Sequence, residues 1–252
     1  MYNFFVDKNK AYDDGYLIDG TDYNHIINVL RMRENDRFLV SCDGKSDLCE
    51  IVSFDGESVN VKIIEADFCA NELPTELYLF QGLPKSDKME LIIQKTVELG
   101  VSKIYPVEMK NCVVKLEEKK KLSKISRWQS IAESAAKQSK RNVIPQICEV
   151  ISFDKMLEVS KELDLLIVPY ENQKGMNSLK NVFKSVRSGM KIGVLIGPEG
   201  GFSEKEINKI SSESAMLVSL GRRILRTETA AIVGISALML YIESNLDGDC
   251  LD

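Results

Sequence analysis

The stretch "VLIGPEGGFSEKEI", residues 194–207, decides the fold class of this chain. An apolar, strand-like run ends in a glycine-rich turn, and the start of a helix follows at once. Ser203 and Glu206 have the S-x-x-E spacing of a capping box, which fixes where that helix begins. A strand, a glycine turn and a helix in direct succession are typical of a parallel α/β sheet, which binds ligands at the carboxyl ends of its strands.

The turn itself offers backbone groups and one carboxylate to a ligand. Gly197, Gly200 and Gly201 permit backbone conformations closed to other residues and let a ligand approach the main chain. Pro198 stiffens the turn and Glu199 adds an acid, whereas no lysine follows as in a phosphate-binding G-x-x-x-x-G-K-[ST] loop. We therefore expect a neutral ring or a cation here rather than a polyphosphate. Taken alone, the turn is equally well explained as a helix entry with an exposed acid.

A second loop, "SLGRRILRTETAA" at 219–231, also lies between an expected strand and an expected helix. Gly221 bends the chain, and the apolar Ile224 and Leu225 are placed to wall a ligand. Thr227 is expected to cap the final helix. Because the carboxyl ends of parallel strands share one edge of the sheet, both loops belong to the same edge. Taken alone, "RTET" is equally well explained as a helix cap with a nearby charge pair.

Strands and helices alternate from residue 71 onward, which predicts a parallel sheet covered by helices. The expected strands are 77–83, 103–108, 146–151, 164–169, 192–197 and 215–220. The expected helices are 87–99, 117–140, 153–162, 177–187, 203–213 and 228–244. Gly100 is the expected left-handed stop of the first helix. The last helix is apolar nearly all round, so we expect it to be covered within the domain or, preferably, by a second subunit.

Residues 1–70 differ in character from residues 71–252 and are expected to form a separate domain. Its β-rich runs are 37–42, 48–54 and 58–66, divided by the turn signals "DGKSD" and "DGE". Residues 21–32 are expected to form a short helix with Thr21 as its N-cap. A small β-barrel with one helix fits this pattern.

Composition excludes several classes of function. The chain has 252 residues and a net charge of −5, so any nucleic-acid binding must come from local basic patches. The six cysteines form no C-x-x-C pair and His25 is the only histidine, which argues against a metal site and against serine-histidine catalysis. No apolar run reaches membrane-spanning length and the N-terminus lacks the pattern of a signal peptide, so we expect a cytoplasmic protein.

The two loops together resemble the signature of the RsmE family. These are SPOUT-class methyltransferases that act on N3 of a uridine in the 16S ribosomal RNA of the small subunit. "LPKSDKMELIIQKTVELGVSKIYPV", "NCVVKL" and "RWQSIAESAAKQSKRNVIPQI" resemble further segments of the family's catalytic domain. "HIINVLRMRENDRFLV" resembles the helix and strand of its PUA-like RNA-binding barrel. The resemblance covers almost the whole chain.

The resemblance implies a PUA-like barrel followed by a trefoil-knotted α/β domain, a homodimer, no metal, and S-adenosylmethionine as cofactor. This cofactor carries a neutral adenine and a sulfonium cation, which agrees with a glycine loop that contains an acid. The implied cofactor contacts are Ile196, Gly197, Pro198, Glu199, Gly200, Leu220, Gly221, Ile224, Leu225, Arg226, Thr229 and Ala230, with Tyr170 and Glu171 as further candidates.

The motifs also suggest residues for catalysis and for RNA binding. We hypothesise that Arg226 faces the uracil oxygens and that Glu199 or Glu228 orients the imide or accepts its proton. The candidate RNA contacts are Arg31, Arg33, Lys85 and Arg141. One departure stands out, because relatives usually have a basic residue directly before "FFV" and this chain has Asn3.

Two alternatives stay open. One is a SPOUT enzyme that methylates another nucleotide, such as a transfer-RNA ribose 2′-hydroxyl. The other is a non-catalytic RNA-binding assembly factor that retains the fold. Intact glycine loops argue against the second alternative.

Overall fold

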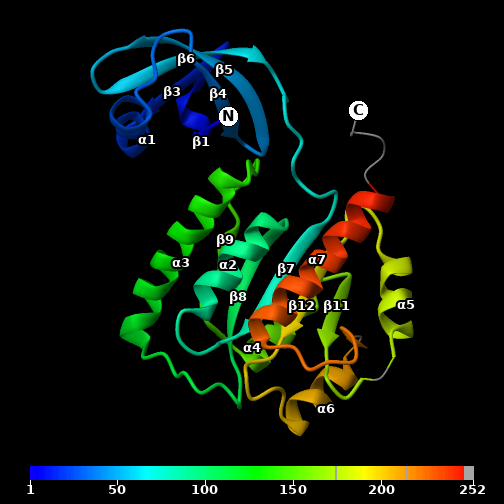
Figure 1. The fold of residues 1–252 in the computed structure, drawn as a ribbon. Coiled ribbons are helices and arrows are strands. Elements are labelled where there is room, and N and C mark those ends of the chain that lie inside the picture. Colours follow the sequence, from blue (N-terminus) through cyan, green and yellow to red (C-terminus); the bar gives the residue numbers. More distant parts are fainter. Residues whose placement is uncertain (174, 214, 247–252) are drawn as a thin grey trace. The chain divides into compact units, whose positions relative to one another are not determined.

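The computed structural model describes residues 1–173, 175–213 and 215–246 of the chain (Figure 1). The chain forms two compact units. The first contains Met1–Glu72 together with Ala136–Ile144, and the second contains the rest of the chain. Each unit has its own sheet.

The first unit is built on a six-stranded sheet in the order β1-β4-β5-β6-β3-β2. Its strands are β1 (Asn3–Phe5), β2 (Ala11–Tyr12), β3 (Gly15–Asp19), β4 (Arg37–Cys42), β5 (Lys45–Phe54) and β6 (Ser58–Glu65). β1 pairs with β4 in parallel, and the other neighbours are antiparallel. Alternate residues point into one core, in which Phe38 and Val40 of β4 and Val59 and Val61 of β6 are fully buried. The three expected strands are present, whereas β1, β2 and β3 were not expected from the sequence.

The helix expected over 21–32 is shorter and changes its winding. α1 (Gly20–Asn24) continues into the π-helical turn η2 (His25–Val29), and a 3₁₀ turn, η1 (Lys8–Lys10), lies near the N-terminus. The prediction that Thr21 caps this helix is wrong, because Asp19 is the N-cap residue and Thr21 already lies inside α1. Ile26 on η2 is fully buried in the core of the first unit, and this contact fixes the turn against the sheet.

The second unit is built on a seven-stranded sheet in which every recorded pairing is parallel. The order is β10-β8-β7-β12-β11-β13, and β9 pairs with β8. The strands are β7 (Glu76–Gly82), β8 (Val101–Glu108), β9 (Gln146–Ile147), β10 (Ile151–Ser152), β11 (Leu165–Pro169), β12 (Lys191–Ile196) and β13 (Met216–Val218). The expected strand 146–151 is thus divided into β9 and β10, and the other five expected strands are confirmed.

Helices cover both faces of this sheet, as alternation predicted. They are α2 (Lys88–Glu98), α3 (Glu118–Gln138), α4 (Phe153–Ser160), α5 (Asn177–Ser185), α6 (Glu204–Ser212) and α7 (Thr227–Asn245). Phe80 of β7 packs in one cluster with Met156 of α4 and Ile210 of α6. On the opposite face α7 approaches β12, where a Cβ at Gly234 would lie 3.8 Å from Val194, and α2 packs against α7.

Two local predictions about helix ends are confirmed. Ser203 and Glu206 form the reciprocal capping box of α6, with the Ser203 hydroxyl accepting from the Glu206 backbone N–H and the Glu206 side chain accepting in return. Gly100 has a φ of +95° directly after α2, and its N–H donates to the carbonyl of Val97. The capping box fixes where α6 begins after β12, and the turn at Gly100 directs the chain from α2 into β8.

Of the residues that the structure describes, no three or more His, Cys, Asp or Glu gather as a metal site. No helix within the described part of the chain is long and apolar enough to cross a membrane.

Candidate active site

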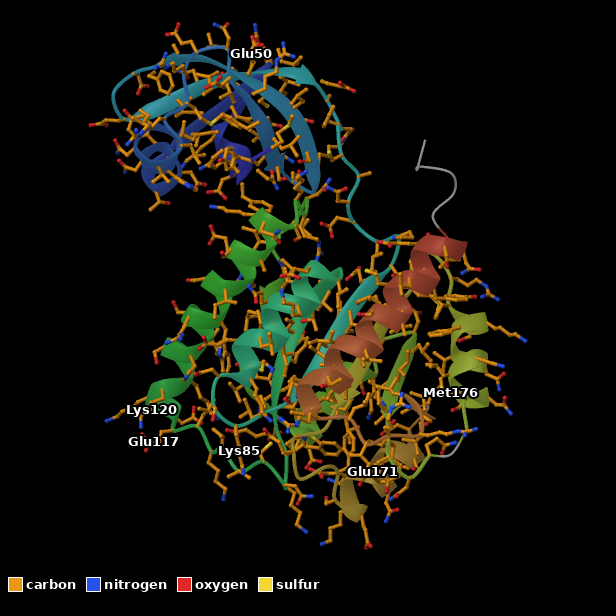
Figure 2. All side chains as sticks on the ribbon, in the orientation of Figure 1. Glu50, Lys85, Glu117, Lys120, Glu171 and Met176 are labelled. Atoms are coloured by element: carbon orange, nitrogen blue, oxygen red, sulfur yellow. The ribbon has the colours of Figure 1, made fainter. Side chains whose placement is uncertain are left out.

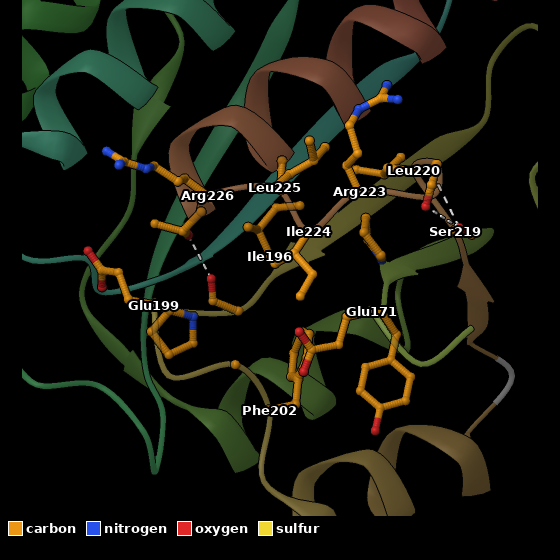
Figure 3. Close-up of a pocket in the computed structure, with 18 of the residues that line it drawn as sticks. Glu171, Ile196, Glu199, Phe202, Ser219, Leu220, Arg223, Ile224, Leu225 and Arg226 are labelled. Atoms are coloured by element: carbon orange, nitrogen blue, oxygen red, sulfur yellow. Dashed lines mark hydrogen bonds between the residues drawn. The ribbon is translucent and has the colours of Figure 1, made fainter. Parts of the chain in front are cut away.

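A cavity of about 480 Å³ opens in the second unit, where the loops that follow β11, β12 and β13 come together (Figure 3). Its volume lies in the usual range for small-molecule sites. The last residue of β12, Ile196, lines the cavity, and the loop after β12 contributes Gly197, Pro198, Glu199, Gly200, Gly201 and Phe202. The loop after β13 contributes Ser219, Leu220, Gly221, Arg222, Arg223, Ile224, Leu225 and Arg226, and the remaining lining residues are Lys88, Pro169, Tyr170, Glu171, Thr227 and Ala230. Of the residues predicted to contact the cofactor, only Thr229 is absent from this lining.

The glycine loop after β12 is packed too closely for larger residues. A Cβ at Gly200 would lie 2.9 Å from the backbone oxygen of Asn111, and the Asn111 amide donates to the carbonyl of Gly200 at 3.0 Å. From the other side, a Cβ at Gly82 would lie 2.7 Å from both Cδ and N of Pro198. Gly201 has a φ of +64°, the left-handed region that favours glycine. The loop is therefore held in one conformation by its neighbours.

Thr227 fastens this loop to the last helix. The prediction that Thr227 caps α7 is wrong, because Arg226 is the N-cap residue and Thr227 is the first residue of the helix. Its hydroxyl instead donates to the carbonyl of Gly197 at 2.7 Å and accepts from Nε2 of Gln81 at 2.9 Å. Gln81 is fully buried at the end of β7. These two bonds tie β7, the glycine loop and the start of α7 together.

The carboxylate of Glu199, which lines the cavity, and that of Glu228, which is not among the lining residues, meet one ammonium group. Nζ of Lys88 lies 3.0 Å from Oε1 of Glu199 and 3.2 Å from Oε2 of Glu228. The backbone N–H of Lys85 donates to the same Oε1 of Glu199 at 3.1 Å. Burial by itself raises the pKa of Glu199, but the hydrogen bonds from Lys88 and from the Lys85 backbone outweigh it and hold the pKa below its ordinary value. Glu199 is therefore ionised at neutral pH.

The rest of the cavity combines apolar walls with exposed arginines. Figure 3 shows Ile196, Leu220 and Leu225 between the two loops, with Arg226 on the side of Glu199. Tyr170 and Phe202 form an edge-to-face pair with ring centroids 6.3 Å apart. Close-packed glycine backbone, apolar walls and a carboxylate fit a neutral aromatic ring joined to a cation better than they fit a polyphosphate.

The predicted RNA-binding residues fall into two groups. Arg31 and Arg33 are exposed on the first unit, and Lys85 is exposed at the edge of the second unit, at the same end of that unit as Glu171 (Figure 2). Arg141 differs, because it is only 2% exposed and its Nε donates to Oε1 of Glu72 at 2.8 Å. Its guanidinium is therefore committed to a structural ion pair inside the first unit.

Asn3 also has a structural place. It is 5% exposed, its Nδ2 donates to the carbonyl of Arg141 at 3.0 Å, and its Oδ1 accepts from the hydroxyl of Ser41 at 3.0 Å. A basic side chain is not needed for either bond. The departure from the family pattern therefore affects packing in the first unit.

Sequence reasoning missed Lys88 and Gln81. Both residues lie at or after the end of β7, the central strand that neighbours β12. Ligands gather at the carboxyl ends of parallel strands, and this rule applies to β7 as much as to β12. It would therefore have indicated the segment after β7 as part of the site.

Comparisons with known proteins agree with this architecture. The family model described as RNA methyltransferase domain matches residues 71–239, and the model described as RNA methyltransferase PUA domain matches residues 18–64. The expected fold, a PUA-like barrel followed by a SPOUT-type parallel-sheet domain, is thereby confirmed.

Individual relatives match over nearly their full length. Ribosomal RNA small subunit methyltransferase E of Bacillus subtilis is 36% identical over 96% of this chain and 98% of that protein. The protein of the same name from Mesomycoplasma hyopneumoniae is 33% identical over 92% of this chain and 96% of its own length. A Neisseria gonorrhoeae protein of this name, solved bound to S-adenosyl methionine, is 30% identical with a TM-score of 0.79, over 95% of this chain and 97% of that one. The chain therefore belongs to the ribosomal RNA small subunit methyltransferase E family of RNA methyltransferases.

Proposed function

We propose that this protein transfers a methyl group from S-adenosylmethionine to N3 of a specific uridine in the 16S ribosomal RNA of the small subunit. The observation that carries the proposal is the cavity between the loops after β12 and β13, with its close-packed glycines, apolar walls and carboxylates. The names of the full-length relatives and the cofactor bound in the Neisseria protein support it.

The cavity supplies the groups that such a cofactor needs. Gly197, Gly200 and Gly221 present backbone groups in the lining for the nucleoside, and Ile196 and Leu225 cover its ring faces. The other proposed contacts are Pro198, Glu199, Leu220, Ile224, Arg226, Thr229 and Ala230. When bound, S-adenosylmethionine supplies an electrophilic methyl carbon whose bonding pair leaves with the sulfonium sulfur.

The protein's own task is to position the uracil and to help remove the N3 proton. Arg226 is exposed at the mouth of the cavity, so its guanidinium is available for the uracil oxygens that gain charge. Glu199 and Glu228, which share the ammonium group of Lys88, are the carboxylates that orient the imide or accept its proton. The electron pair of the broken N–H bond remains on N3 for the new bond to carbon.

Each unit supplies proposed contacts to the RNA. Arg31, Arg33 and Lys85 are the proposed phosphate contacts, since each is exposed. Arg141 is left out because its guanidinium is paired with Glu72.

We also propose a homodimer with α7 at the interface. Val233 and Leu240 of this helix are 38% and 60% exposed, and a second copy covering them explains why the helix is apolar nearly all round. We further propose that the enzyme acts in the cytoplasm, since its proposed substrate is ribosomal.

Incubation of the purified protein with unmodified small subunits and labelled cofactor tests the proposal. Nucleoside analysis should find the label in N3-methyluridine of 16S ribosomal RNA. Label in a ribose 2′-O-methyl nucleoside would instead favour another RNA methyltransferase specificity. RNA binding without cofactor binding in a calorimetric titration would favour a non-catalytic assembly factor.

A further inference from the structure

Glu199 and Glu228 differ in how much of their hydrogen-bonding capacity is already used. Oε1 of Glu199 accepts from both the Lys85 backbone and the Lys88 ammonium. Oε2 of Glu228 is buried and accepts no hydrogen bond. The Lys88 ammonium group forms an ion pair with this oxygen at 3.2 Å. No other donor within the described residues hydrogen-bonds to the Glu228 side chain.

Burying a carboxylate oxygen is costly, and among the described residues Lys88, which Glu199 shares, is the one cation paired with Glu228. The side chain of Glu228 is only 15% exposed, compared with 24% for Glu199. Its other oxygen, Oε1, is not buried and accepts no hydrogen bond from the described residues, so it can accept from a donor brought by a ligand. The imide N3–H of uracil is such a donor.

The backbone that carries Glu228 is held in a fixed position. Glu228 is the second residue of α7, directly after Thr227, whose hydroxyl is fixed between Gly197 and Gln81. It also directly follows the pair Arg226 and Thr227 that line the cavity. A side chain on a helix held in this way keeps its position better than one on a loop.

We propose that the two carboxylates beside Lys88 have different roles. Glu199 is the fixed ion-pair partner of Lys88, whereas Glu228 accepts the N3–H hydrogen bond and then the proton. The inference rests on the proposed reaction at N3. The N3–H bond breaks, its electron pair forms the bond to the methyl carbon, and the proton passes to the Glu228 carboxylate. Lys88 acts as a positioning residue, since its ammonium group holds the two carboxylates side by side.

The matched variants Glu228→Gln and Glu199→Gln test the division. Each keeps the shape and removes the charge. Glu228→Gln should slow single-turnover methylation of small subunits at saturating cofactor by about 10²–10⁴-fold, the usual contribution of a general base. Glu199→Gln keeps an oxygen for its two donors and should slow the same step less than about tenfold. Equal losses, or a larger loss in Glu199→Gln, would overturn the assignment.

Chemical rescue distinguishes a base from a structural residue, because an added carboxylate restores the rate only if the lost group accepted the proton. Added formate should restore part of the rate of Glu228→Ala, because a small carboxylate can take the vacated position, but it should not restore Glu199→Ala. Absence of rescue in Glu228→Ala, with cofactor affinity unchanged by calorimetry, would contradict the base role.

Lys88→Met should slow single turnover at saturating cofactor, and Lys88→Arg should recover most of the rate. In the Glu228→Gln background Lys88→Met should cost little more, because Lys88 acts through that carboxylate; losses that multiply would overturn its positioning role. The matched control is Lys95→Met, which removes a lysine of the same helix that, within the described part of the chain, pairs with Glu98.

Failure of the inference differs from failure of the proposed function. If the wild-type protein forms N3-methyluridine and Glu228→Gln is as fast, only the inference is wrong. If the wild-type protein forms no N3-methyluridine, the proposed function itself is wrong.

Discussion

The hydroxyl of Thr227 donates to the carbonyl of Gly197 at 2.7 Å, although the two residues lie 30 positions apart in the chain. Through this bond the last helix holds the glycine loop in place. The same hydroxyl accepts from Gln81, so its loss removes one hydrogen bond from Gly197 and one from Gln81.

We predict that Thr227→Val lowers the free energy of unfolding by about 1–3 kcal/mol, because Gly197 and Gln81 lose their shared partner. Cofactor affinity should fall as well, since the loop is no longer fixed. Urea unfolding and calorimetry measure the two effects. Thr227→Ser, which keeps the hydroxyl, is the control, and a Thr227→Val protein as stable as the wild type would refute the role of the bond.

Gly82 should be intolerant of a methyl group for a different reason. In Gly82→Ala the new Cβ would lie 2.7 Å from N and Cδ of Pro198, so the glycine loop must move. We expect cofactor affinity to fall about tenfold or more. Gly234→Ala serves as the control, because the nearest atom to its Cβ is 3.8 Å away and alanine favours a helix. Equal affinities of the two variants would show that the packing of Pro198 is irrelevant to the site.

Substitutions of Arg141 and Arg33 in the first unit should have different effects, one on stability and the other on RNA binding. Arg141→Ala removes one partner of a buried ion pair, and we expect it to destabilise the protein by about 3 kcal/mol. Arg33→Ala should leave stability unchanged but weaken RNA binding and reduce the salt slope of the affinity by about one. Thermal unfolding and a salt titration of RNA affinity distinguish them. An Arg141→Ala protein of wild-type stability with a reduced salt slope would restore Arg141 as an RNA contact.

The ion pair of Glu199 with Lys88 should be insensitive to pH near neutrality. The pKa of Glu199 is lowered from its ordinary 4.5, so its contribution to stability is present above that value and is lost only as the pH falls through the lower folded value. The hydrogen bond to Glu199 raises the pKa of Lys88 above 10.5, so that contribution is complete below this value and is lost at higher pH. The stability difference between wild type and Glu199→Gln should thus be constant from about pH 6 to 9 and shrink in acid. A marked change between pH 6 and 8 would contradict this pairing.

Local signals in the sequence were enough to place most elements and both loops of the site. The capping box of Ser203 and Glu206 and the stop at Gly100 depend on residues a few positions apart, and both are confirmed. The strands β1 and β2 were missed because they are only three and two residues long, too short for a periodic pattern. Hydrophobic periodicity carries no information about a knot, which only the family resemblance implies.

Contacts between distant segments could not be read from the sequence. Arg141 resembles a surface cation in a basic run, but Glu72 lies 69 positions earlier and neutralises it. Lys88 and Glu199 are 111 positions apart, and nothing local in either segment indicates that they meet. Thr227 has the residue type of a helix cap, yet its hydroxyl donates to the carbonyl of Gly197 on another loop. In each case tertiary structure supplies the partner that decides the role.

The central claim is that the cavity between the loops after β12 and β13 holds the methyl donor. A crystal structure of the protein with S-adenosylmethionine tests it most directly. The claim predicts the cofactor between Ile196–Gly200 and Leu220–Arg226, with its methyl group open to the side of Glu228. A structure in which these loops are unchanged and the cofactor is bound elsewhere would contradict the claim.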